Sequence, residues 1–94
     1  MHELPEFPLP IRYRADVLTD LRRLGAVPRP TTQPRLVYSF LRALMTFEIR
    51  ERKLRRRELE QVFGPQPLSD YAAEIEKLRA KYHLLRRLPQ HWIE

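Results

Sequence analysis

The sequence predicts an all-α protein, a small bundle of three helices: one short, one long and central, and one amphipathic and C-terminal. Apolar residues recur at helical spacing in three segments, and no segment alternates as a strand would. The 94-residue chain also carries nine prolines, which cluster at the boundaries of these segments. Because a chain of this length buries one modest core, we expect residues 1–94 to form a single helical domain.

Residues 1–12 are predicted to form an extended, proline-rich arm. Proline alternates there with large apolar residues, and it disfavours helix in the residue before it. Apolar side chains are unusual in a mobile tail. We therefore expect Phe7 to lie against a helix or against a partner.

The first helix is predicted over residues 14–24. Val17, Leu18, Leu21 and Leu24 recur at helical spacing. Gly25 follows as a natural C-terminal stop, because glycine adopts the left-handed conformation that ends many helices.

The long helix is predicted over residues 34–63, continuous or kinked, between Pro34 at its first position and Gly64 at its end. Its apolar residues cover most of its circumference, so it must be covered on more than one side. One broad face carries Leu36, Val37, Phe40, Leu41, Leu44 and Phe47. Tyr38, Met45 and Ile49 lie nearly opposite. Either the other two helices and the N-terminal arm cover the long helix, or part of it forms a subunit interface, for which these three residues are the candidates.

The third helix is predicted over residues 69–88, from a Ser69 cap to the stop at Pro89. Its apolar residues follow alternating steps of three and four, the pattern of a heptad seam. The seam contains Leu68, Tyr71, Ile75, Leu78, Tyr82 and Leu85. A tail, residues 89–94, follows. Trp92 in this tail is expected either to fold back onto the bundle or to dock on a partner.

A basic run, residues 50–57, holds six cations and one anion. Residues three and four apart are neighbours on a helix, so three of these cations can pair with Glu48, Glu51 and Glu60. Arg50, Lys53 and Arg57 remain as a stripe without an acid beside it. The basic residues of the third segment, Lys77, Lys81 and Arg87, are further candidates for phosphate or acidic-partner contacts.

Little in the sequence predicts catalysis. Cysteine is absent, the two glycines stand alone, and the three histidines are scattered, so we expect no catalytic residues, metal site, cofactor or small-molecule substrate. No apolar run approaches the roughly 20 residues of a membrane span, and no signal peptide opens the chain. We therefore expect a cytoplasmic protein.

Two functions remain after these exclusions. The first is a small non-catalytic interaction module, an accessory subunit, adaptor or homodimer, which binds another protein or itself through Tyr38, Met45, Ile49, Phe7 and Trp92. The alternative is weak, largely non-specific nucleic-acid binding by the basic stripe, since the net charge of +6 favours anionic partners.

Overall fold

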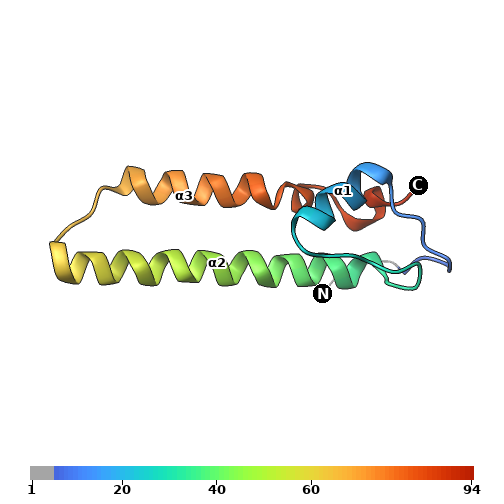
Figure 1. The fold of residues 1–94 in the computed structure, drawn as a ribbon, viewed down its shortest axis with the longest axis horizontal. Helices are drawn as coiled ribbons and strands as arrows, with labels where there is room; N and C mark the ends of the chain where they lie inside the picture. The colour runs from blue at the N-terminus through green and yellow to red at the C-terminus, as the bar shows by residue number, and fades with distance from the viewer. Residues whose placement is uncertain (1–5) are drawn as a thin grey trace. The chain divides into compact units, whose positions relative to one another are not determined.

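The computed structural model describes residues 6–94, and the first five residues of the predicted arm lie outside this range. Three α-helices and two short 3₁₀ helices follow one another along the chain (Figure 1). They are α1 (Ala15–Arg23), α2 (Pro34–Phe63), α3 (Leu68–Lys81), η1 (His83–Arg86) and η2 (Pro89–Trp92). The described residues contain no β-strand, so the prediction of an all-α fold is confirmed.

The chain forms two compact units, which are described separately. Unit 1 comprises the chain up to Arg42 together with His83–Glu94, and unit 2 comprises Ala43–Tyr82. The continuous helix α2 contributes residues to both.

The core of unit 1 joins α1 to the first turns of α2 and to the C-terminal residues. Val17, Leu21, Leu41 and Trp92 are completely buried. The N-terminal segment adds a short backbone pairing, in which Tyr13 forms an isolated antiparallel bridge with Ile93. This pairing ties the segment before α1 to the C-terminus, and it buries the Tyr13 side chain, which raises the pKa of its phenol to about 12.

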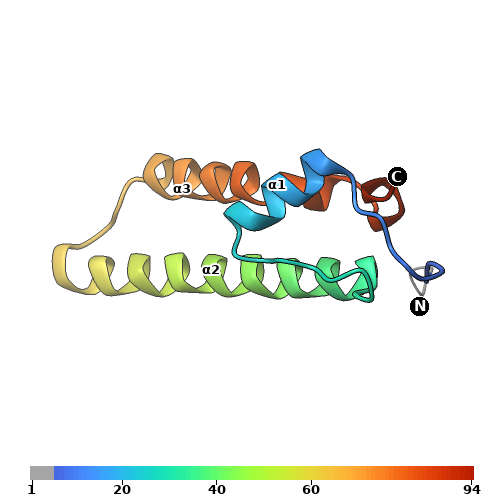
Figure 2. The same ribbon diagram turned by 45° about the vertical axis from the view of Figure 1, so that its right-hand side comes forward.

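Unit 2 is an αα-hairpin in which α3 runs back beside the later part of α2 (Figures 1 and 2). Gly64 ends α2 with a positive φ of 83°, a conformation that glycine adopts without a steric penalty. Leu78 is the buried residue of α3, and Tyr82, which directly follows the helix, is buried as well. Leu68, the first residue of the predicted seam, is exposed instead.

The third helix is shorter than predicted. The spacing of apolar residues predicts helix to residue 88, but α3 ends at Lys81 and Tyr82 leaves the helical conformation with φ −102° and ψ 36°. The two 3₁₀ helices that follow bury Leu84 and Trp92. Ser69 does not cap α3, because the residue before the helix is Pro67 and no side chain caps it.

Candidate interaction site

The structure divides the broad apolar face that the sequence predicts for α2: Val37 and Leu41 are buried, whereas Leu36, Phe40 and Phe47 are exposed. Leu36 and Phe40 in unit 1 are 51% and 52% exposed, and Phe47 and Leu54 in unit 2 are 60% and 57% exposed. These four residues follow one another at steps of four, seven and seven, which places them on one side of a continuous helix. We call them the exposed α2 face.

The residues predicted to contact a partner lie on the other side of α2. Tyr38, Met45 and Ile49 are half-buried. The ring of Tyr38 lies 6.0 Å from the ring of Trp92, measured between centroids, with the two planes tilted by 46°. The buried side of α2 therefore combines Val37 and Leu41 of the broad apolar face with the half-buried Tyr38, Met45 and Ile49, and most of the rest of the broad face is exposed.

Trp92 and Phe7 are held by unit 1 itself. Trp92 is buried, and its indole N–H donates a hydrogen bond to the carbonyl oxygen of Leu84 at 3.3 Å. Of the two placements considered for the tail, the structure has the one folded back onto the protein. Phe7 is half-buried, and its backbone N–H and carbonyl both bond the side-chain amide of Gln33, at 2.9 Å and 3.0 Å.

A polar cluster joins the two helices of unit 2. The carboxylate of Glu48 accepts hydrogen bonds from Lys81 Nζ at 2.9 Å and from the hydroxyl of Tyr82. Burial acts to raise the pKa of Glu48, but the two hydrogen bonds and the charges of Lys81 and Arg52 outweigh it, so the pKa of Glu48 is lowered. The pKa of Tyr82 is raised by burial and by its bond to Glu48. Lys81 is therefore engaged within the protein.

The stripe of cations survives in the structure, although the pairs beside it differ from the prediction. Arg50, Lys53 and Arg57 are exposed and form no ion pair with any residue of the range 6–94. The predicted pair of Arg56 and Glu60 is present at 3.0 Å.

The predicted pair of Glu48 and Arg52 is replaced by contacts with α3, and the predicted pair of Glu51 and Arg55 is not formed. Arg52 approaches Glu74 at 3.9 Å, and Glu48 bonds Lys81, so both reach across the hairpin instead of along α2. Of the further candidate cations, Arg87 lies 3.9 Å from Asp16, whereas Lys77 is exposed and forms no ion pair within the described chain.

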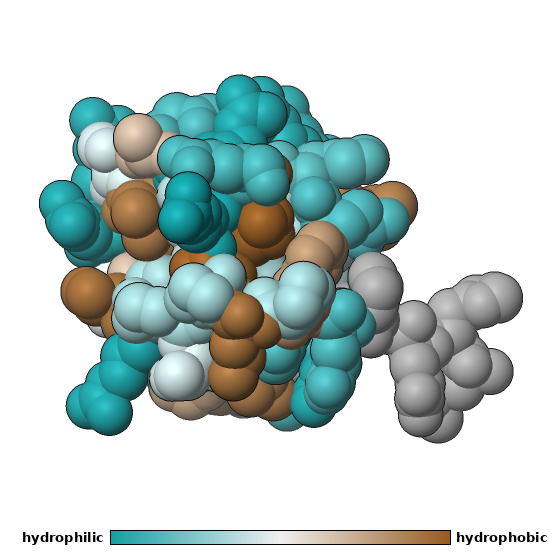
Figure 3. Space-filling model, turned by 90° about the vertical axis from the view of Figure 1, so that its right-hand side faces the viewer, coloured by the Kyte–Doolittle hydropathy of each residue, from teal (hydrophilic) through white to brown (hydrophobic). Residues whose placement is uncertain are grey.

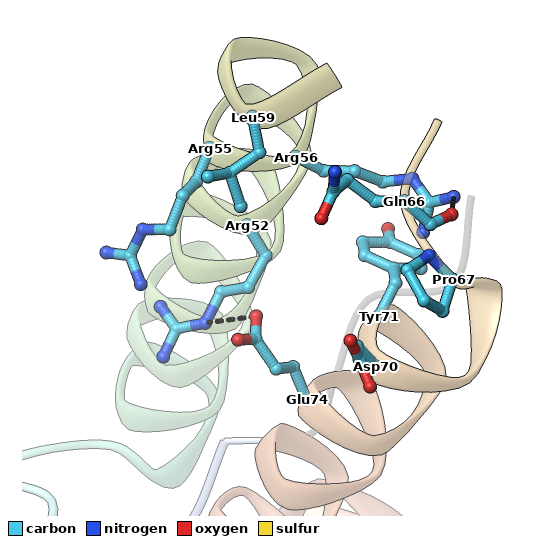
Figure 4. A pocket seen from close by; sticks show the side chains of 9 residues that line it. All are labelled: Arg52, Arg55, Arg56, Leu59, Gln66, Pro67, Asp70, Tyr71 and Glu74. Atoms are coloured by element: carbon cyan, nitrogen blue, oxygen red, sulfur yellow. Dashed lines mark hydrogen bonds and ion pairs between the residues drawn. The ribbon is translucent and has the colours of Figure 1, made fainter. Parts of the chain in front are cut away.

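The residues that line a small pocket near the turn of unit 2 make polar contacts with one another (Figure 4). Its volume is about 70 Å³. The Arg56 guanidinium lies 5.4 Å above the ring of Tyr71 and donates to the carbonyl oxygen of Gln66 at 3.1 Å. Arg52 points to Glu74 across the opening, while Arg55 points away (Figure 4). This pocket is far smaller than the roughly 300–1,000 Å³ of ordinary ligand sites.

A larger groove lies in unit 1, between α2 and the segment that precedes it. Its volume is about 220 Å³. Residues 26–28 and Thr32 line one side, and Leu36, Val37 and Phe40 of α2 line the other. Thr32 is the only polar residue of this lining. Leu36 and Phe40, which belong to the exposed α2 face, are thus also part of a shaped apolar groove.

Residues 6–94 hold no group of three or more His, Cys, Asp or Glu side chains that could bind a metal ion. His83 lies near the carboxylate of Asp20, with its Nε2 atom 3.0 Å from Oδ2. Within that same range, no helix is both long and apolar enough to cross a membrane.

Comparison with protein-family models, curated proteins and solved structures found no match to this chain.

Proposed function

We propose that the protein is a small helical interaction module, which binds another protein through the exposed α2 face. The observation that carries this proposal is the exposure of Leu36, Phe40, Phe47 and Leu54, each of which keeps more than half of its surface in water. Single exposed apolar residues are ordinary on protein surfaces. Four at heptad steps along one helix are the arrangement by which helices bind protein partners.

The proposed binding surface consists of apolar residues that the chain itself leaves exposed. Trp92, Tyr38, Met45 and Ile49 are buried or half-buried within the chain, so the proposed interface consists of the exposed α2 face in their place. An interface core needs large apolar or aromatic side chains that lose water on binding, and the two phenylalanines on this face provide them.

Light scattering and binding of an apolar fluorescent dye test the proposal. The wild-type chain is expected to bind the dye or to self-associate, and a variant carrying Phe40→Ser and Phe47→Ser is expected to lose most of that behaviour. Leu88→Ser is the matched control, because Leu88 is 48% exposed but lies outside α2. A strictly monomeric wild-type chain without dye binding contradicts the proposal.

A second function is supported by the unpaired cations of unit 2. Arg50, Lys53 and Arg57 lie within two turns of α2, and three phosphate contacts would give a slope of log affinity against log salt of about −2 to −3. Binding of this kind is weak and largely independent of sequence. Gel shifts of DNA and RNA at low salt test it, and no shift of either excludes it.

A further inference from the structure

The groove of unit 1 has walls that are fixed by backbone contacts. Ile11 N–H donates to the carbonyl of Pro30 at 2.8 Å, and Ala26 N–H donates to the carbonyl of Leu21 at 2.8 Å. Two hydrogen bonds between Arg29 and Thr32 close the turn between these points. The Arg29 N–H donates to Thr32 Oγ1 at 3.0 Å, and the Thr32 N–H donates to the Arg29 carbonyl at 2.9 Å. The segment that lines the groove is therefore held in place beside α2.

The size and lining of the groove suit apolar side chains of a peptide. Its volume of about 220 Å³ is below the roughly 300 Å³ at which small-molecule sites begin. Its only polar lining residue is Thr32, whose backbone N–H and side-chain oxygen both take part in the turn with Arg29. Brown, apolar surface lies among teal, polar surface on the side of the molecule shown in Figure 3.

The charge of unit 1 favours an acidic occupant. Its described residues, 6–42 and 83–94, include nine arginines and four carboxylate residues, and nine minus four leaves a formal charge of +5. Three of those carboxylates already pair with arginines. Five exposed arginines form no ion pair with any described residue: Arg12, Arg22, Arg29, Arg42 and Arg86.

Arg29 connects this charge to the groove. It follows Pro28, a lining residue, and it forms the turn with Thr32, which is another. A carboxylate beside a side chain seated in the groove would therefore lie close to an exposed arginine whose backbone is held in the groove wall. A second copy of this chain fits less well, because it would bring another unit of charge +5 to the same place.

We infer that the groove binds an acidic amphipathic segment of a partner protein, with apolar side chains against Leu36 and Phe40 and carboxylates beside Arg29. This inference rests on the proposed function and adds the chemistry of the partner. Apolar contact supplies affinity in such an interface, and charge complementarity selects the partner.

Fluorescence anisotropy with synthetic peptides tests the inference. The probe is a 16-residue helical peptide with leucine on one face and glutamate on the other. The comparison peptides carry lysine in place of glutamate, or the same leucines and glutamates in scrambled order. The wild-type chain is expected to bind only the first, and the binding is expected to weaken with salt.

Two pairs of variants locate the site. Leu36→Ser is expected to weaken binding about tenfold, the effect of removing one large apolar contact, whereas Leu88→Ser is expected to leave it unchanged. Arg29→Gln is expected to weaken binding several-fold, whereas Arg57→Gln, which changes a residue of unit 2, is expected to leave binding unchanged. Circular dichroism confirms that each variant is folded.

The alternative outcomes are distinct. Equal binding of the glutamate and lysine peptides, or of the scrambled peptide, overturns the acidic partner. Dye binding that depends on α2 together with no peptide binding overturns this inference and leaves the proposed function intact. Displacement of the probe by a DNA duplex that also requires Arg29 assigns the site to nucleic acid. A dimer that Leu36→Ser dissociates assigns it to a second copy.

Discussion

Leu41→Ala and Phe40→Ala change adjacent residues of α2 that lie in opposite environments. Leu41 is fully buried in unit 1, and Phe40 is 52% exposed. Because Leu41 is buried and Phe40 is half in water, we expect the free energy of unfolding to fall sharply for the first variant and little for the second.

The expected magnitudes follow from burial. Removing a fully buried leucine side chain and leaving a cavity costs about 2–5 kcal/mol. Phe40 buries about half of a side chain, or about 100 Å², worth at most about 2.5 kcal/mol at 25 cal/mol per Å². The extended reference chain overstates this burial, and alanine favours helix by about 0.5 kcal/mol, so about 1 kcal/mol remains.

Urea unfolding followed by circular dichroism measures both values. The linear dependence on urea gives the free energy of unfolding, and an unchanged slope shows that each variant exposes the same surface on unfolding. A loss for Phe40→Ala as large as that for Leu41→Ala would refute the orientation of α2 and, with it, the exposed α2 face.

Three further predictions concern residues outside that face. Tyr82→Phe removes a hydrogen bond to the Glu48 carboxylate, and we expect it to cost about 2 kcal/mol at pH 7. The pKa of Glu48 is lowered in the folded protein. The stabilisation by this hydrogen bond is therefore present above the unfolded pKa of about 4.3 and is lost as the pH falls through the folded pKa. Urea unfolding at pH 7 and at pH 3 measures the cost of the substitution at each pH, and an equal cost at both contradicts the pairing. Trp92→Ala is expected to cost about 3–5 kcal/mol in urea unfolding, whereas a neutral effect would mean that the tail is not part of the core of unit 1. If the chain shifts DNA at low salt, Arg57→Gln is expected to reduce the salt slope by about one, measured by titration at several salt concentrations, and an unchanged slope removes Arg57 from the contact.

The ends of α2 could be predicted from sequence because they depend on local chemistry. Proline fits the first turn of a helix, since its missing N–H has no partner there, and Gly64 supplies the positive φ that ends the helix. The predicted and observed ranges of this helix agree, from residue 34 to residue 63.

The covered side of α2 could not be predicted, because its apolar residues surround most of the helix. Periodicity indicates which residues share a side, but contacts distant in sequence decide which side is buried. In unit 1, Trp92 packs its ring near Tyr38 and so covers that side of α2. The end of α3 was missed for the same reason: a seam continued through Leu85, but the chain leaves the helix at Tyr82.

The candidate site was found only in part. The unpaired cations Arg50, Lys53 and Arg57 follow from helical spacing alone, and the structure leaves them exposed. Lys81 was predicted to be available to a partner, but it binds Glu48, which is distant in sequence and so could not be identified from helical spacing. The groove beside Leu36 requires residues 26–32 to fold against α2, which no pattern in that proline-rich segment indicates.

The most direct test of the interaction proposal compares two affinity-tagged baits, the wild-type chain and Phe40→Ser, in extracts of cells that express the protein. Both baits must show the same helical content by circular dichroism. We predict that the wild-type bait retains one protein in an amount nearly equal to that of the bait itself. The Phe40→Ser bait is predicted not to retain this protein. Retention of no protein, or of the same proteins by both baits, would contradict the proposal that the exposed α2 face is a binding surface.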